Sequence, residues 1–264
     1  MGFPAVLADF ASGLRQTQAE GGLHLSSFVQ IPDPNLIEAL AKSKLQSFIM
    51  DMQHGMFDER AVLAGVAAAA LEGKPALVRL PVDCSGLASR VLDFGAAGTV
   101  CPMVNTVADA ERLVTYLKFP PLGGRSWGPR RAIPITGLSP PQYLTQGNAL
   151  TVVLAMIETR QALDNLDAIL AVPGIDGVFV GPVDLSVSLS DGKRLDSPDV
   201  VPAIAHVGAR ARAAGKIAGI FAGTSSIAAD SHAKGFGFIA LQQDAMFLQQ
   251  AADAACDAVR DGLG

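Results

Sequence analysis

The stretch VVLAMIETRQALDNLDAILAVPGIDGVFVGPVDLS, from Val152 to Ser186, has the pattern of a strand, a helix and a second strand. One carboxylate follows each predicted strand: Glu158 comes directly after VVLAMI, and Asp184 comes shortly after GVFVGP. In a parallel sheet with helical crossovers, the carboxyl ends of successive strands lie on one face. These two acids can therefore converge although they are far apart in the chain.

The same alternation extends to both sides of this stretch. Short apolar runs predict eight strands, at residues 25–29, 46–50, 76–80, 99–103, 151–157, 177–180, 216–221 and 237–241. Apolar residues at helical spacing predict helices between the strands and one before them, including those at 4–17, 160–171, 198–214, 225–234 and 244–261. Side chains that suit helix starts support this pattern: we expect N-caps at Asp33, Asp58 and Ser85, and a capping box of Thr106 with Asp109.

Eight strand and helix pairs in a chain of 264 residues predict a (β/α)8 TIM barrel, a single domain over residues 1–264 with an N-terminal helix. A doubly wound open sheet is the alternative fold, but no GxGxxG motif follows the first strand. Residues 120–148 interrupt the alternation because they are rich in proline and glycine. We expect this segment to be irregular, and functional or mobile.

Composition excludes several classes of protein. Half of the residues are hydrophobic and 17% are charged, which indicates a compact globular protein. The net charge is −5 and no basic cluster is denser than Arg125–Arg131, so we do not expect binding to nucleic acid. The beginning of the chain does not resemble a secretory signal, and the longest charge-free apolar run, Ala61–Leu71, is too short for a membrane span. Three cysteines without paired spacing predict reduced thiols and a cytoplasmic location.

Polar residues at the predicted strand ends indicate where a site would lie, because a barrel carries its functional groups on that face. Besides Glu158 and Asp184, these residues are Asp51, His54, Arg79 and the run Gln242–Asp244. His54 is the only histidine expected there and could transfer protons, with Asp51 orienting it, although it could also merely hydrogen-bond within its loop.

Arg79 lies between apolar neighbours and needs a partner. An ion pair with Asp51 or Asp93 would satisfy it, and an arginine at a barrel mouth can also hold a carboxylate or an enolate.

Two alternatives remain for the acids of the opening stretch. Glu158 could cap the helix that starts near Thr159, and Asp184 could cap a turn after Gly181–Pro182. Two carboxylates at successive strand ends are less easily explained as caps than as ligands of a divalent cation. We therefore favour a site for Mg²⁺, Mn²⁺ or Co²⁺, with the remaining octahedral positions left to water and substrate. The lysines fall at helix ends, strand starts or loops, which argues against an imine mechanism.

From about Leu25 to Asp244 the chain resembles the class II, HpcH/HpaI-type aldolases, pyruvate-dependent enzymes on a (β/α)8 barrel. The resemblance is carried, in order, by FIMDMQHGMFD (Phe48–Asp58), LVRLP (Leu77–Pro81), VLDFGAAGTVCPMV (Val91–Val104), FPPLGGRSWG (Phe119–Gly128), MIETRQALDNLDAI (Met156–Ile169) and GIDGVFVGPVDLSVSL (Gly174–Leu189). Two positions differ from relatives: this chain has Gln53 where many carry Glu, and Met156 where some carry Gln.

The resemblance implies a role for each residue of the expected site. Glu158 and Asp184 would be the metal ligands, and His54, steered by Asp51, would move the proton of the aldol hydroxyl. Arg79 would bind the oxo or enolate oxygen, with Asp93 supporting that network. The backbone N–H groups that follow Gly181 and Pro182, near Val183 and Asp184, would receive the pyruvate carboxylate. The resemblance also implies a homo-oligomer, a hexamer or trimer, in which residues 120–148 take part in closing the site.

The sequence thus predicts a divalent-metal-dependent aldolase. It would reversibly cleave a 4-hydroxy-2-oxo acid into pyruvate, or hydroxypyruvate, and an aldehyde, through a metal-stabilised enolate. One alternative is a citrate-lyase-like acyl-CoA lyase, whose CoA phosphates would need basic residues such as Arg125, Arg130 and Arg131. Another is a non-catalytic 2-oxo-acid binding protein that keeps the barrel.

Overall fold

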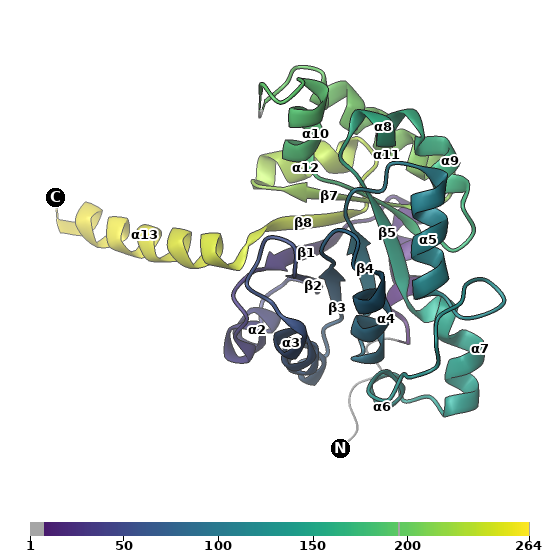
Figure 1. Cartoon of the computed structure of the whole chain (residues 1–264). Helices are drawn as coiled ribbons and strands as arrows, with labels where there is room; N and C mark the ends of the chain where they lie inside the picture. Colours follow the sequence, from purple (N-terminus) through teal and green to yellow (C-terminus); the bar gives the residue numbers. More distant parts are fainter. Residues whose placement is uncertain (1–7, 195, 264) are drawn as a thin grey trace.

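The computed structural model describes residues 8–194 and 196–263, and its centre is a closed barrel of parallel strands. Each strand pairs with the next, and β1 pairs with both β2 and β8, which closes the barrel (Figure 1). The strands are β1 (His24–Val29), β2 (Ser47–Asp51), β3 (Ala76–Arg79), β4 (Gly98–Cys101), β5 (Val152–Ile157), β6 (Gly177–Val180), β7 (Ile217–Ala222) and β8 (Phe238–Gln243).

The predicted (β/α)8 barrel is confirmed, and the open sheet is excluded by the pairing of β1 with β8. All eight predicted strands are present, and β6 has the predicted bounds. The other strand ends differ from the prediction by one or two residues, because hydrophobicity marks the buried part of a strand better than its last hydrogen bond. The strands between His24 and Gln243 form one barrel, and the single domain over residues 1–264 stays a prediction.

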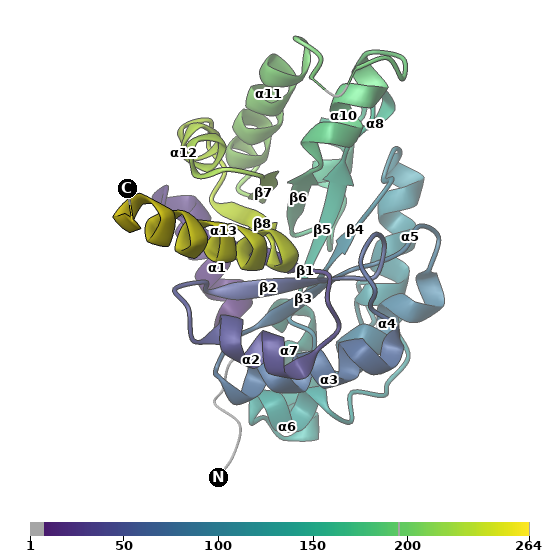
Figure 2. The same ribbon diagram turned by 90° about the vertical axis from the view of Figure 1, so that its left-hand side faces the viewer.

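Helices surround the barrel (Figure 2). They are α1 (Phe10–Glu20), α2 (Pro34–Ala41), α3 (Glu59–Leu71), α4 (Ser85–Asp93), α5 (Val107–Leu117), α6 (Ala132–Thr136), α7 (Pro140–Leu150), α8 (Arg160–Asp164), α9 (Leu166–Ala171), α10 (Pro182–Leu189), α11 (Val200–Ala213), α12 (Ser225–Ala233) and α13 (Asp244–Leu263). The N-terminal helix predicted at 4–17 is present as α1, three residues further along at its end, and residues 4–7 of that prediction lie outside the described residues. None of the helices in the described part of the chain is long and apolar enough to cross a membrane.

The predicted caps are confirmed at three of four helices. Asp33 and Asp58 each accept a hydrogen bond from a backbone N–H of the first turn, and Thr106 forms the capping box with Asp109. The prediction for Ser85 is wrong: Ser85 is the first residue of α4, and Cys84 occupies the cap position without a side-chain hydrogen bond.

Three helical features differ from the predictions. The segment 120–148 is irregular mainly in its first part, because α6 and α7 occupy most of the residues from Ala132 onward; Ser139 and Pro140 provide a good start for α7. Residues 160–171 form two short helices, divided at Asn165. The residues after Gly181 form α10 instead of a turn, since Pro182 suits the first helical position.

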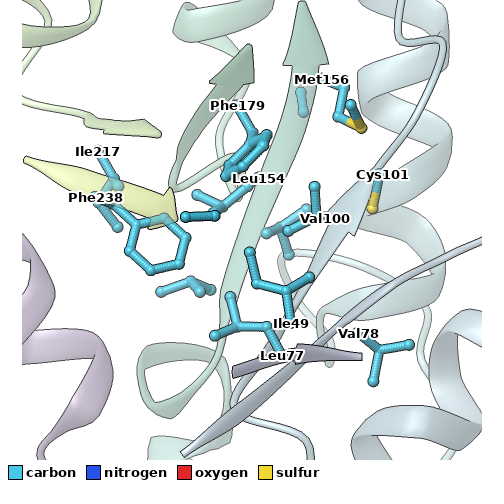
Figure 3. Close-up of a cluster of buried hydrophobic side chains, with 14 of the residues drawn as sticks. Ile49, Leu77, Val78, Val100, Cys101, Leu154, Met156, Phe179, Ile217 and Phe238 are labelled. Carbon is cyan, nitrogen blue, oxygen red and sulfur yellow. The ribbon is translucent and has the colours of Figure 1, made fainter. Parts of the chain in front are cut away.

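Buried apolar side chains from the strands fill the barrel and the space beneath the helices (Figure 3). Phe179 of β6 and Phe238 of β8 meet edge to face with ring centroids 6.1 Å apart. Phe28 of β1 contacts Phe179 and Phe221 in the same manner, at 5.9 and 5.7 Å. These rings lie below the carboxyl ends of the strands and give the mouth of the barrel an apolar floor.

Helix α1 covers the opposite, amino end of the barrel. Its Gln18 side chain is buried and accepts hydrogen bonds from the backbone N–H groups of Ala218 and Gly237, at 3.0 and 3.1 Å. The same amide donates to the carbonyl oxygen of Gly235 at 3.0 Å. Gln18 therefore connects the N-terminal helix to the starts of β7 and β8.

We predict that Gln18→Leu lowers the free energy of unfolding by about 1–3 kcal/mol, because two buried backbone N–H groups lose their acceptor. Gln16→Leu is a matched control in the same helix, since Gln16 is exposed and bonds only to Glu20 in the structure. It should change the free energy by less than about 0.5 kcal/mol. Urea unfolding measures both values, and equal effects of the two substitutions would contradict this role of Gln18.

Candidate active site

The two acids of the opening stretch converge at the carboxyl ends of β5 and β6. Glu158 directly follows β5, and Asp184 lies in the first turn of α10, after β6. A Cβ atom at Gly181 would lie 3.2 Å from Glu158 Oε2 and 3.3 Å from Asp184 Oδ2. Both carboxylates therefore face the space beside the Gly181 backbone, and only glycine leaves that space open.

Neither acid is a helix cap. Thr159, not Glu158, caps the following helix by accepting a hydrogen bond from the N–H of Ala162. Glu158 is buried and instead accepts a hydrogen bond from the backbone N–H of Met103, with an N···O distance of 2.6 Å. Asp184 lies within α10 and not at its cap position, which Gly181 occupies. The capping alternative is thus excluded for both residues.

The environment of Glu158 disfavours its charged form. Burial raises the pKa of its carboxyl group above the ordinary value, and the nearby charge of Asp184 acts in the same direction. The hydrogen bond from Met103 and the charge of Arg79 oppose this shift without cancelling it. A buried carboxylate held close to a second, exposed one is a suitable environment for a cation.

A second pair of charged residues lies at the ends of β2 and β3. Arg79 donates two hydrogen bonds to Asp51, from Nε to Oδ1 at 2.9 Å and from Nη2 to Oδ2 at 2.7 Å. Its guanidinium also lies over the ring of Phe28, 4.5 Å from the ring centre. The ion pair that the sequence offered as one explanation of Arg79 is therefore present, and it holds the guanidinium in one orientation.

Asp51 is completely buried and accepts five hydrogen bonds, two from Arg79 and three from Gln30, Gln53 and His54. Burial alone would raise the pKa of Asp51, but the bonds and charge of Arg79, with those of Gln30 and His54, lower it below its ordinary value. Asp51 therefore remains a carboxylate at neutral pH. Its hydrogen bond to His54 is made with the backbone N–H, so Asp51 orients the loop that carries the imidazole.

These residues surround one cavity of about 180 Å³. Its floor is apolar, and the predicted residues His54, Arg79 and Asp184 line it, whereas Asp51 and Glu158 lie behind the lining. The lining consists of Phe28, Gln30, His54, Arg79, Met156, Phe179, Gly181, Pro182, Val183, Asp184, Phe221 and Gln243. The first turn of α10, which begins at Pro182, faces the cavity. Backbone N–H groups in the first turn of a helix have no partner within the helix, so this end favours a negatively charged group.

Asp93 and the segment 120–148 are not part of this cavity. Asp93 ends α4, close to the start of β4, and therefore lies near the amino end of the barrel. There it accepts a hydrogen bond from Arg125 at 2.6 Å, and the Arg125 side chain is almost completely buried. Within one chain, Asp93 does not join the Asp51–Arg79 network, and the segment does not cover the mouth of its own barrel.

Reasoning from the sequence missed two residues that hold the site, Met103 and Gln30. Met103 is not glycine yet has a φ of 56°, a conformation that directs its N–H toward Glu158. Gln30 follows β1 and donates to Asp51. Neither residue type is typical of a catalytic motif, so the available signal was position: Gln30 follows the predicted strand 25–29, and Met103 ends the predicted strand 99–103.

The donor set fits a hard divalent cation better than zinc. Among the described residues, no group of three or more His, Cys, Asp or Glu side chains is placed to hold a metal ion. Structural zinc usually has four such ligands, whereas Mg²⁺ is commonly bound by one or two carboxylates together with water and substrate. Glu158 and Asp184, with open space beside Gly181, provide this arrangement.

The pattern of the HpcH/HpaI aldolase/citrate lyase family matches residues 25–251. The chain belongs to this family. The predicted resemblance is thereby confirmed, and the matched region includes every residue of the cavity.

Relatives within this HpcH/HpaI family are similar over nearly the full chain. A hydroxypyruvate/pyruvate aldolase from Rhizorhabdus wittichii is 43% identical over 88% of this chain and 92% of its own. A 2-keto-3-deoxy-L-rhamnonate aldolase from Salmonella gallinarum is 35% identical, over 93% and 90%. The crystal structure of a family protein from Burkholderia cenocepacia has a TM-score of 0.85 and 31% identity, covering 94% of this chain and 99% of that one. The chain is a carbon–carbon lyase, as the sequence predicts.

We predict that Glu158→Gln stabilises the metal-free protein at neutral pH. Because the pKa of Glu158 is raised in the folded state, the folded protein holds this proton more tightly than the unfolded chain. The wild type therefore loses stability relative to the variant as the pH rises above about 4.5, the ordinary value, and below that pH the difference no longer depends on pH. Urea unfolding in the presence of a chelator, from pH 4 to pH 8, measures the difference.

The control for this series is Glu59→Gln. Glu59 is partly exposed and paired with Arg90 at the surface, so its substitution should change the stability by less than about 0.5 kcal/mol at every pH. A Glu158→Gln protein that is less stable than the wild type at pH 7 would show that the charge of Glu158 is not destabilising.

Proposed function

We propose that this member of the family is a divalent-metal-dependent aldolase that reversibly cleaves a 4-hydroxy-2-oxo acid into an aldehyde and pyruvate or hydroxypyruvate. The observation that carries the proposal is the convergence of Glu158 and Asp184 on the open space at Gly181, in the cavity that also contains Arg79. The names of the aldolase relatives support both candidate donors.

Glu158 and Asp184 would hold the cation, which we propose to be Mg²⁺, Mn²⁺ or Co²⁺. When bound, the cation would be chelated by the 2-oxo acid. It would stabilise the negative charge that develops as the carbon–carbon bond breaks. Gly181 keeps the approach to both carboxylates free of a side chain. The hydrogen bond from Met103 holds Glu158 in position for this task.

Arg79 would place a second positive charge against the oxo oxygen, which becomes the enolate oxygen. Its bidentate pairing with Asp51 and its position over Phe28 restrict the guanidinium to one orientation before the substrate arrives. A fixed charge of this kind needs no rearrangement in the transition state, which is where such groups contribute most to the rate.

His54 would accept the proton of the C4 hydroxyl group in the cleavage direction, directly or through one water, and return it in the condensation direction. Its imidazole lines the cavity, and the bond from its backbone N–H to Asp51 holds the loop at the rim. The first turn of α10, at Val183 and Asp184, would receive the carboxylate of the 2-oxo acid.

The two alternative functions receive less support from the structure. A CoA substrate would need cations near the cavity, but the Arg125 side chain is buried against Asp93 near the amino end of the barrel. Arg130 and Arg131 follow Arg125 in the same segment, outside the residues that line the cavity. A binding protein without activity would have no need of a histidine and a bidentate arginine at the mouth.

Exchange of the methyl protons of pyruvate with D₂O tests the proposed function. The protein is incubated with pyruvate and Mg²⁺, Mn²⁺ or Co²⁺, EDTA is added, and the remaining methyl signal is measured by ¹H NMR. We expect exchange with at least one cation, none with EDTA present from the start, and a loss of about 1000-fold or more in Asp184→Asn. Asp164→Asn, which changes a carboxylate of α8 outside the cavity, is the control and should keep the wild-type rate.

Exchange that continues at the wild-type rate in Asp184→Asn or in EDTA would contradict the metal-dependent mechanism. Binding of pyruvate and cation without any exchange would favour the non-catalytic alternative. A screen of aldehyde acceptors with each donor then identifies the second substrate.

We also propose that the protein is a homo-oligomer in which α13 contacts a second copy. This helix extends away from the barrel (Figure 1), and only Asp244 is buried among its residues. An apolar stripe runs along it at helical spacing, formed by Leu248, Ala252, Ala255, Val259 and Leu263. Beside its start lies an apolar groove of about 450 Å³, lined mainly by Leu25, Leu40, Leu45, Leu241, Phe247 and Ala251. We propose that the stripe of one copy packs into the groove of another.

We predict that the double substitution Leu248→Glu and Val259→Glu reduces the assembly to a smaller mass, because it places charges within the apolar stripe. Gln250→Glu, on the opposite side of α13, should leave the mass unchanged. Light scattering after size exclusion measures both, and an unchanged mass of the double variant would contradict an interface through this stripe.

The cytoplasmic location remains a prediction.

A further inference from the structure

Gln30 lies at the mouth of the barrel, where it connects the ends of β1, β2 and β8. It directly follows β1, its side chain lines the cavity, and its carbonyl oxygen accepts a hydrogen bond from Met56 N at 3.0 Å. Gly55 allows this close approach, because a Cβ atom there would lie 3.0 Å from the Cα of Gln30. The loop that carries His54 is thus built against Gln30.

A buried carboxylate holds Gln30 from below. The backbone N–H of Gln30 donates to both oxygens of Asp244, at 3.0 and 3.1 Å, and Ile31 N–H donates to Oδ2 at 2.9 Å. Asp244 is completely buried, and it is the first residue of α13. The position of Gln30 is therefore set by Asp244, the residue that follows β8 and starts the projecting helix.

A bulge in β8 brings Asp244 close to Gln30. The pairing of β1 with β8 shifts by one residue between Ser27 and Phe28, so that Phe28 lies opposite Gln243 and Gln242 is the extra residue. Gln242 has a φ of 26°, which is unusual for a residue other than glycine. This bulge lets Gln243 line the cavity and brings Asp244 to the end of β1.

The side chain of Gln30 acts on the ion pair of the site. Its Nε2 donates to Asp51 Oδ2 at 3.1 Å, and the same oxygen accepts from Arg79 Nη2 at 2.7 Å. The other oxygen of Asp51 accepts from Arg79 Nε and from two backbone N–H groups of the His54 loop. Because Asp51 has no exposed surface, water cannot replace a donor that is removed.

We infer that Gln30 is a positioning residue, which holds Asp51 and through it the Arg79 guanidinium, and that Asp244 fixes Gln30 for this purpose. The inference rests on the proposed aldolase function. It adds a chain of contacts from the start of α13 to the guanidinium: Asp244 to Gln30, Gln30 to Asp51 and Asp51 to Arg79.

Pyruvate proton exchange with the effective cation, measured over a range of pyruvate concentrations, tests the inference. Gln30→Met removes the amide donor and keeps the length of the side chain. Because Arg79 acts on the developing enolate, we expect kcat to fall about tenfold or more while KM changes less than about twofold. Asp244→Asn, which turns an N–H donor toward the N–H groups of Gln30 and Ile31, should lower kcat in the same manner.

Gln46→Met is the matched control. Gln46 lies at the amino ends of β1 and β2, where its Oε1 accepts a hydrogen bond from Leu25 N at 2.8 Å. Because Gln46 is exposed and lies far from the cavity, its substitution should keep the wild-type kcat. The unfolding temperature of each variant, measured alongside, separates loss of stability from loss of positioning.

A second arm uses Asp51→Asn as the background. If Gln30 acts through Asp51, adding Gln30→Met to Asp51→Asn should lower kcat less than about twofold further. An unchanged kcat in Gln30→Met overturns the inference, and so does a raised KM with unchanged kcat, which would make Gln30 a direct substrate contact. Full additivity with Asp51→Asn also overturns it. If the wild type itself shows no cation-dependent exchange, the proposed function fails instead.

Discussion

The pairing of β8 with β1 is the constraint on which the site depends. It closes the parallel sheet into a barrel, so the carboxyl ends of all eight strands lie on one rim. Glu158 and Asp184 reach that rim from β5 and β6, while Asp51 and Arg79 reach it from β2 and β3. The bulge in β8 uses the same pairing to place Asp244 beneath β1. A rigid closed sheet therefore fixes the relative positions of charges that come from distant parts of the chain.

The site combines charges that destabilise the folded chain with charges that are fully compensated. Asp51 is buried but has five donors, and its pKa is lowered accordingly. Glu158 is buried close to Asp184, and its pKa is raised. The first arrangement is complete without a ligand and orients Arg79. The second lacks positive charge, which a divalent cation would supply, so the same feature that lowers stability in the metal-free protein favours binding of the cation.

The sequence predicted the parts of the fold that depend on local patterns. Short apolar runs marked all eight strands, and Asp33, Asp58 and Thr106 marked helix starts because their side chains satisfy free N–H groups. Prediction failed where proline and glycine suggest a break but begin a helix, at Pro182 and Pro140. For the site, the expectation that polar residues at strand ends share one face correctly placed these residues together: Glu158, Asp184, Asp51, Arg79 and His54. They did not reveal Met103 or Gln30, whose roles come from backbone geometry and long-range contacts, and Asp93 lies near the other end of the barrel.

The central claim is that Glu158 and Asp184 together bind the cation that serves the reaction. Diffraction from crystals soaked with Mn²⁺ and pyruvate, measured at the absorption edge of manganese, tests it most directly. The account predicts one strong anomalous peak beside Gly181, with oxygens of both carboxylates about 2.0–2.3 Å away and pyruvate oxygens completing the coordination. A peak bound by only one of these carboxylates, or by neither, would contradict the account.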